Sequence, residues 1–193
     1  MRGPRRLMIL LRSVLSSWSA VKSTVTGYRT YKDDFGAFSI DTPLDWMRRI
    51  MFPAAQDVPA FRVIYVTPKD TADLFVLPKV TEPGGLFGIP EPVVMVAAAD
   101  EEIEGINEIP LTEALGAADT TVVRETTRMY GTVEAKESEL EWPDSSGKKH
   151  ARTIVLTRPG LTLFLLAVVG ESKRDAYSDT ISHIIDSLKP GTG

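Results

Sequence analysis

The feature that most constrains the fold lies in the last third of the chain, where two strand-like runs are joined by a tight turn. The first run, Ala151–Arg158, is rich in Thr, Ile, Val and Leu, and the second, Leu161–Val169, is almost entirely apolar. Between them, Pro159 and Gly160 supply the restricted φ and the accessible positive φ that such a turn requires. A nine-residue apolar run is typical of a strand that is covered on both faces. The sequence therefore predicts a hairpin at the centre of a sheet.

The spacing of apolar residues changes after Gly170 to that of a helix. The apolar positions follow a stripe with a period of 3.6 residues and are Tyr177, Ile181, Ile184, Ile185 and Leu188. Ser172 is a candidate N-cap, and Pro190 with Gly191 would end the helix. We expect this helix to lie across the sheet and close the core.

Further strands are predicted upstream by alternating or continuous apolar residues. They are expected around Phe38–Asp41 and at Phe61–Thr67, Pro92–Ala99, Thr121–Met129 and Thr132–Trp142. A short helix is expected at Pro110–Ala117, with proline in its first turn. The many charges of the strand at 132–142 predict a sheet edge or an open face there. These elements together predict an α+β fold.

The N-terminal segment differs from the rest of the chain in charge. Residues 1–22 contain five basic and no acidic side chains, and the remaining 17 basic and 26 acidic residues leave the body at −9. We divide the chain into a basic docking segment with its connector, residues 1–27, and one domain, residues 28–190. The candidate partner-docking residues are basic or apolar side chains of this segment and one phenylalanine of the Pro/Gly-rich loop at 78–92: Arg5, Arg6, Leu7, Leu11, Trp18, Lys22 and Phe87.

Two alternatives stay open for the N-terminal segment. It could pack against its own domain, or it could be a retained targeting signal of the twin-arginine kind, since Arg5 and Arg6 precede a short apolar run. Phe87, in turn, could cover the core instead of contacting a partner.

Composition argues against several classes of function. The chain has no cysteine, which excludes disulfides and thiolate chemistry. Its acidic body argues against nucleic-acid binding over a broad face. No phosphate loop, nucleophile elbow, dinucleotide fingerprint or two-histidine metal motif is present, so we expect no enzyme activity. Of the two histidines, His183 lies off the apolar stripe, and His150 is the candidate metal ligand.

Several short motifs, taken in order, resemble those of the PsbP family, the extrinsic lumenal proteins of photosystems and their relatives. The likeness covers about Tyr31 to Leu188 and is carried by six segments: Phe35–Trp46, Val93–Val96, the acidic loop with Leu111–Leu115, Tyr130–Gly131, Gly147–His150 and Gly170–Arg174. The chain departs from the family in lacking its longer ion-retention arm and in the loop at 78–92.

The resemblance implies a central antiparallel sheet flanked by helices, an α/β/α sandwich. The apolar residues on one side of the basic segment, among them Leu7, Leu11 and Trp18, predict an N-terminal helical extension in addition. It implies a non-catalytic extrinsic subunit in the chloroplast thylakoid lumen, peripheral to the membrane, that stabilises a photosystem and supports oxygen evolution. The implied partners are the photosystem core and neighbouring small or antenna subunits, with the membrane surface as a further contact. No intrinsic cofactor is expected, although the family's role in retention of calcium suggests a divalent cation.

A different class of function is the alternative. The chain could instead be a soluble lumenal protein that binds a small ligand or metal, or assists assembly, through His150 and nearby acidic side chains. A binder of the small GTPase Ran, which shares the fold, is a third hypothesis.

Overall fold

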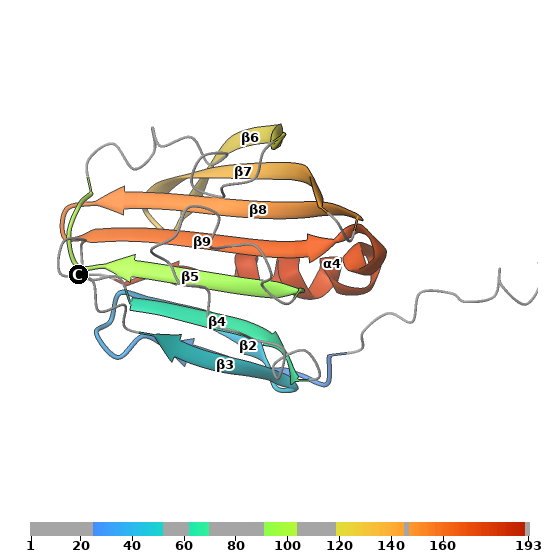
Figure 1. The fold of residues 1–193 in the computed structure, drawn as a ribbon. Coiled ribbons are helices and arrows are strands. Elements are labelled where there is room, and N and C mark those ends of the chain that lie inside the picture. The colour runs from blue at the N-terminus through green and yellow to red at the C-terminus, as the bar shows by residue number, and fades with distance from the viewer. Residues whose placement is uncertain (1–24, 52–61, 70–90, 104–118, 145–146, 192–193) are drawn as a thin grey trace, which may run out of the picture.

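The computed structural model describes residues 25–51, 62–69, 91–103, 119–144 and 147–191. These residues form ten strands and one helix (Figure 1). In chain order the elements are β1 (Tyr28–Lys32), β2 (Phe38–Pro43), β3 (Trp46–Met51), β4 (Arg62–Pro68), β5 (Val93–Ala99), β6 (Thr121–Tyr130), β7 (Val133–Asp144), β8 (Gly147–Arg158), β9 (Leu161–Gly170), α4 (Glu171–Asp186) and β10 (Lys189–Pro190).

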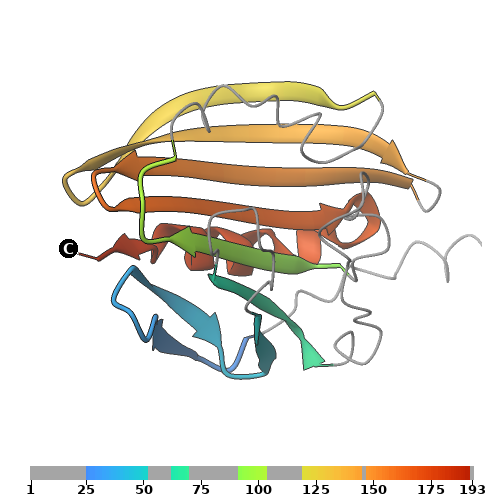
Figure 2. The same cartoon turned by 60° about the vertical axis from the view of Figure 1, so that its left-hand side comes forward.

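A seven-stranded antiparallel sheet is the main element of the fold. Its strand order is β3-β4-β5-β9-β8-β7-β6, so β9 occupies the middle position. Figure 2 shows β6, in yellow, as the outermost strand at one side of this sheet. The predicted central hairpin is confirmed as β8 and β9, which pair from Lys149–Gly170 to Arg158–Leu161. Gly160 has a φ of +73° in the connecting turn, a conformation that few residues other than glycine adopt readily.

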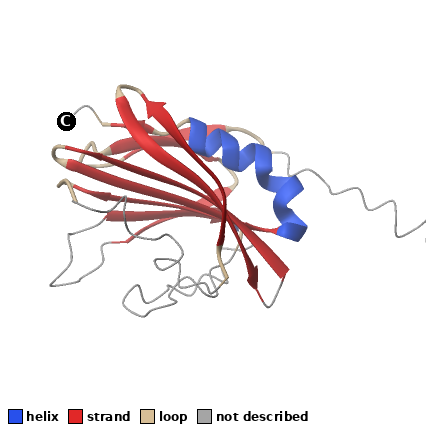
Figure 3. Cartoon of the chain, turned by 90° about the horizontal axis from the view of Figure 1, so that it is seen from above, coloured by secondary structure: helices blue, strands red, loops and turns tan. Residues whose placement is uncertain are grey.

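Helix α4 lies on one face of the large sheet (Figure 3). The side chains that it buries are Thr180, Ile181, Ile184 and Ile185. They pack against β8 and β9 side chains such as Ile154, Leu163 and Leu165, which alternate along their strands and face the helix. Full burial of each isoleucine contributes about 1.5–3 kcal/mol, so this contact is a main source of stability.

A smaller sheet joins the two ends of the domain, with the strand order β1-β2-β10. The two-residue strand β10 follows α4 and pairs with Ser39 and Phe38 of β2. The backbone N–H of Asp41 also donates to the Ser187 hydroxyl over 2.8 Å. Strand β10 was not predicted, because it is defined by its pairing with a distant strand.

The predicted architecture, helices on both sides of a sheet with an N-terminal helical extension, is wrong. The described residues form two antiparallel sheets with a single helix, because α4 is their only long segment with a helical apolar stripe. The helix also begins at Glu171, with Gly170 as N-cap and no capping side chain, so Ser172 is not the cap. The N-terminal segment and the predicted helix at 110–117 lie outside the described residues. No helix within the described ranges is long and apolar enough to span a bilayer.

Candidate functional site: a charged groove beside helix α4

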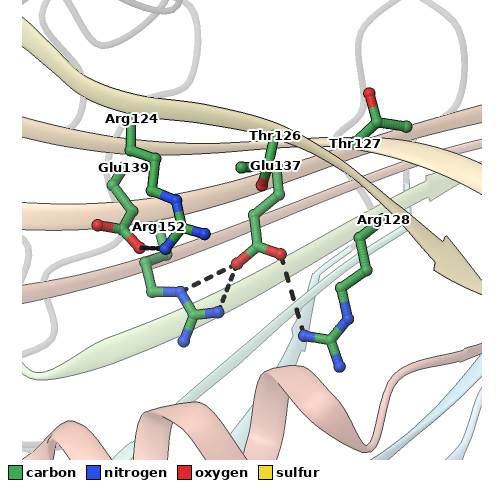
Figure 4. Close-up of a pocket in the computed structure, with 7 residues that line it drawn as sticks. All are labelled: Arg124, Thr126, Thr127, Arg128, Glu137, Glu139 and Arg152. Atoms are coloured by element: carbon green, nitrogen blue, oxygen red, sulfur yellow. Dashed lines mark hydrogen bonds and ion pairs between the residues drawn. The ribbon is translucent and has the colours of Figure 1, made fainter.

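The candidate site is a groove lined by strands β6, β7 and β8 beside helix α4, whose side chains Arg152 and Arg128 reach. Its volume is about 390 Å³. Figure 4 shows most of the charged side chains that line it reaching from the strands toward the helix. Three strands contribute these residues, namely Arg124, Thr126, Thr127 and Arg128 from β6, Glu137 and Glu139 from β7, and Arg152 from β8.

Strand alternation and register bring these charges together. Glu137 and Glu139 lie two residues apart and therefore share one face of β7. The pairing places Arg124 and Arg152 on either side of Glu139. Opposite charges therefore meet across neighbouring strands, an arrangement that stabilises a sheet.

The centre of the groove is Glu137, which is only 8% exposed. Its carboxylate accepts hydrogen bonds from two nitrogens of the Arg152 guanidinium, and Arg128 Nη1 lies 4.0 Å from the other carboxylate oxygen. Arg152 Nη1 also donates to the Ser182 hydroxyl of α4 over 3.2 Å. A buried carboxylate is costly unless it is paired and hydrogen-bonded, so these contacts fix the positions of both charges.

Arg128 lines the groove near the C-terminal end of α4, and its guanidinium lies over the ring of the buried Tyr130, 5.2 Å from the ring centroid. Arg128 Nη1 donates to Asp186 over 2.7 Å, and this hydrogen bond is the main reason that the pKa of Arg128 is raised. Burial raises the pKa of Tyr130 to about 12, with the Glu137 carboxylate as the next cause. The buried Tyr130 hydroxyl has no hydrogen-bond partner among the described residues. Tyr130 is therefore a neutral phenol at physiological pH.

A second hollow of about 220 Å³ adjoins the groove and contains His150. The two hollows share Glu139 and Arg152. The two ring nitrogens of His150 have different partners: Nδ1 lies 3.0 Å from Glu141, and Nε2 contacts Glu171. A hydrogen bond from Lys148 is the main cause that lowers the pKa of Glu141, and the charge of His150 acts in the same direction.

This arrangement does not fit a divalent cation at His150. Glu141 and Glu171 contact opposite nitrogens of the ring and do not converge on one point. No group of three or more His, Asp or Glu residues suited to a metal ion occurs in the described ranges. Calcium binding stays a prediction that rests on the family resemblance alone.

A separate buried cluster around Arg62 was not predicted. Arg62 Nη2 donates to Asp33 over 3.3 Å, and two nitrogens of the same guanidinium donate to Asp100 over 2.6 and 2.7 Å. The hydrogen bond from Arg62 lowers the pKa of Asp100. Phe35, which is exposed, lies with its ring centroid 4.4 Å from the guanidinium carbon. The cluster joins β4 to two turns of the chain, which suggests a structural role.

Of the residues selected from the sequence, the structure places only His150. The other seven, Arg5, Arg6, Leu7, Leu11, Trp18, Lys22 and Phe87, lie outside the described residues. His183, predicted to be a surface residue, is exposed and stacks on Tyr28 with a centroid distance of 3.7 Å. The arginines of the groove were missed, although the charges of β7 had indicated an open face.

Comparison with known proteins shows a likeness of fold. No family model matches the sequence, and no curated protein matches it. Cyanobacterial PsbP from Synechocystis sp. PCC 6803 matches with a TM-score of 0.51 and 12% identity, over 91% of this chain and 99% of that protein. The immunity protein TplEi of Pseudomonas aeruginosa, solved in complex with "L" peptide, matches with a TM-score of 0.52 and 10% identity, over 88% and 100% of the two chains.

A third similar structure is LpqN of Mycobacterium tuberculosis, described as involved in cell envelope biogenesis. It has a TM-score of 0.49 and 13% identity, over 86% of this chain and 91% of LpqN. At 12% and 10% identity, the likeness to cyanobacterial PsbP and to TplEi concerns the fold alone. The chain has a PsbP-like fold.

Proposed function

We propose that this chain is a non-catalytic extrinsic subunit of a photosystem on the lumenal side of the thylakoid membrane. It stabilises the complex through contacts with the photosystem core and neighbouring subunits. The observation that carries this proposal is the match to cyanobacterial PsbP, which extends over 91% of this chain and 99% of that protein.

The geometry of the groove supports a role in binding another protein. The Glu137 carboxylate lies between Arg152 and Arg128, so these charges of the groove are already fixed in position before a partner binds. Arg124, by contrast, is 65% exposed in its side chain and lies 3.9 Å from Glu139. Positioned charges that face solvent favour recognition of a partner of complementary charge. The complex of TplEi with a peptide supports the same use of this fold.

The basic segment at 1–22 is the proposed anchor to the complex or to the membrane surface. Its five positive charges would attract acidic protein surfaces or anionic headgroups. Deletion of residues 1–22 should abolish association and leave the fold intact, because every described element lies downstream. Undiminished association of the truncated chain would contradict the anchoring role.

Affinity purification from detergent-solubilised thylakoid membranes tests the proposed function. The tagged full chain should elute with chlorophyll-bearing subunits, identified by absorption and mass spectra. Washing with about 1 M salt, at which the Debye length falls to ~3 Å, should release it because charged contacts contribute to binding. Elution of the chain alone at low salt would contradict the proposal and would favour the alternative of a soluble ligand-binding protein.

A further inference from the structure

Strand β6 is one of the two edge strands of the large sheet, with β3 at the opposite edge. It is ten residues long and pairs with β7 on one side, and no strand of the described residues pairs with its other side. A long exposed edge presents a row of backbone donors and acceptors that another strand can use. Most of the β6 residues are exposed, so the edge is open to such an addition.

The apolar side chains of β6 point to the same conclusion. Six large apolar side chains of the described residues are exposed, and three of them belong to this strand: Val122 at 45%, Val123 at 54% and Met129 at 56%. The register shift between Val122 and Arg124 marks a bulge in the pairing with β7. Val122 and Val123 lie at the start of the strand and Met129 lies near its end, so both ends of this edge offer apolar side chains to an added strand.

We propose that β6 binds an extended acidic segment of a partner protein, which adds to the sheet as an eighth strand beside the groove. The inference rests on the proposed function in that the partner is a subunit of the same complex. Backbone hydrogen bonds would supply affinity, and the side chains that face the groove would supply specificity.

The charges of β6 favour an acidic partner. Arg124 and Arg128 both face the groove and lie four residues apart, a separation of about 13 Å along a strand. Carboxylates on the added strand, also four residues apart, would lie opposite these two arginines, of which Arg128 also donates to Asp186 over 2.7 Å and Arg124 lies 3.9 Å from Glu139. Glu125 does not oppose this pairing, because it lies on the other face and is paired with Lys136 over 2.9 Å.

A second copy of the chain fits this edge poorly. The two antiparallel self-pairings that use nearly the whole strand are centred on Glu125 or on Thr126. The first places Glu125 opposite its own equivalent, and the second places Arg124 opposite Arg128 twice. Like charges directly opposite one another destabilise a sheet, so the edge discriminates against itself and in favour of an acidic strand.

Synthetic peptides test the inference on the full chain. The probe is a nine-residue peptide of alternating valine and threonine with glutamate at its third and seventh positions. One control carries lysine at both positions, and another carries N-methyl groups on alternate backbone nitrogens, which remove the donors of the strand pairing. Backbone amide NMR gives the dissociation constants, and hydrogen exchange reports on β6.

The acidic peptide should bind and should slow hydrogen exchange in residues 121–130. The lysine peptide should bind at least roughly tenfold more weakly, because two cross-strand charge pairs become repulsive. Arg124→Glu reverses only one of the two charge pairs and should therefore weaken binding of the acidic peptide by a smaller factor, roughly threefold. Arg29→Glu, the same charge change at an exposed site of β1 in the smaller sheet, should have no effect.

Equal binding of the acidic and lysine peptides would overturn the charge assignment. Equal binding of the N-methylated peptide, or binding without slower exchange in β6, would overturn strand addition. These outcomes are independent of the photosystem. If the chain binds the peptide but elutes without chlorophyll, strand addition at β6 is supported and the proposed function is contradicted. If the chain elutes with chlorophyll but does not bind the peptide, the proposed function is supported and strand addition at β6 is contradicted.

Discussion

The helix-facing side of the β7–β8 hairpin is apolar at one end and charged at the other. At the apolar end, Ala135 of β7 lies opposite Leu156 of β8. At the charged end, Glu139 lies opposite Arg152 and Glu141 opposite His150. The two halves lie on the same strands and differ only in the side chains that the register brings together. One hairpin therefore combines an apolar part that closes the core with a charged part that lines the two hollows.

The largest expected effect on stability comes from a residue of α4 that packs on the apolar side of the sheet. Ile184→Ala, in helix α4, removes a side chain that is fully buried against β8 and β9. We expect it to lower the free energy of unfolding by about 2–5 kcal/mol, from the lost burial and the cavity that remains. Urea denaturation measures this. A loss below about 1 kcal/mol would show that α4 does not close the core.

Glu137→Gln should have the next largest effect, because it removes the charge at the centre of the groove. Arg152 and Arg128 would lose their shared carboxylate, at a cost of about 1–3 kcal/mol in unfolding free energy. The double variant Glu137→Leu with Arg152→Met should recover much of this loss, since removing both partners leaves no buried charge. If Glu137→Gln alone were as stable as the wild type, the pairing of Glu137 with Arg152 would be contradicted.

Tyr130→Phe should change how the free energy of unfolding depends on pH only in the alkaline range. The pKa of Tyr130 is raised to about 12 in the folded protein from an ordinary value near 10. Its contribution to stability is therefore complete below about pH 10 and is lost as the pH rises toward 12. The wild type should lose more stability than the Phe variant across this range. Parallel losses in alkaline denaturation curves would contradict the raised pKa.

The smallest effect on stability should come from the rim of the groove. Arg124→Gln breaks only an exposed contact with Glu139, so the free energy of unfolding should change by no more than about 0.5 kcal/mol. A much larger loss would mean that the rim is part of the folded core, and the contrast between the two halves would fail. Thermal denaturation beside Glu137→Gln gives the comparison directly.

Local patterns predicted the central part of the fold well. The hairpin of β8 and β9, the strands β6 and β7 and the stripe of α4 follow from periodicity within short windows. Strand β10 could not be predicted, because it exists only through pairing with β2, which lies far away in the sequence. The expectation of helices on both faces came from the family resemblance and not from the residues of this chain.

The groove could be predicted only in part, because its residues come from different strands that meet through the register of the sheet. The charges of Glu137 and Glu139 indicated an open face, but Arg124, Arg128 and Arg152 come from two other strands. Only the register of the sheet reveals that they meet. His150 was selected because it follows the turn at 144–147 at the start of a predicted strand, and the structure shows that its ring nitrogens contact Glu141 and Glu171.

The most direct test of the account is purification of the tagged wild type, Arg124→Glu and Arg29→Glu chains side by side from solubilised thylakoid membranes. The ratio of chlorophyll to chain in each eluate is the quantity to measure. The account predicts chlorophyll-bearing subunits with the wild type and with Arg29→Glu, and a clearly smaller ratio with Arg124→Glu. Equal ratios for all three chains, or no chlorophyll with any of them, would contradict it.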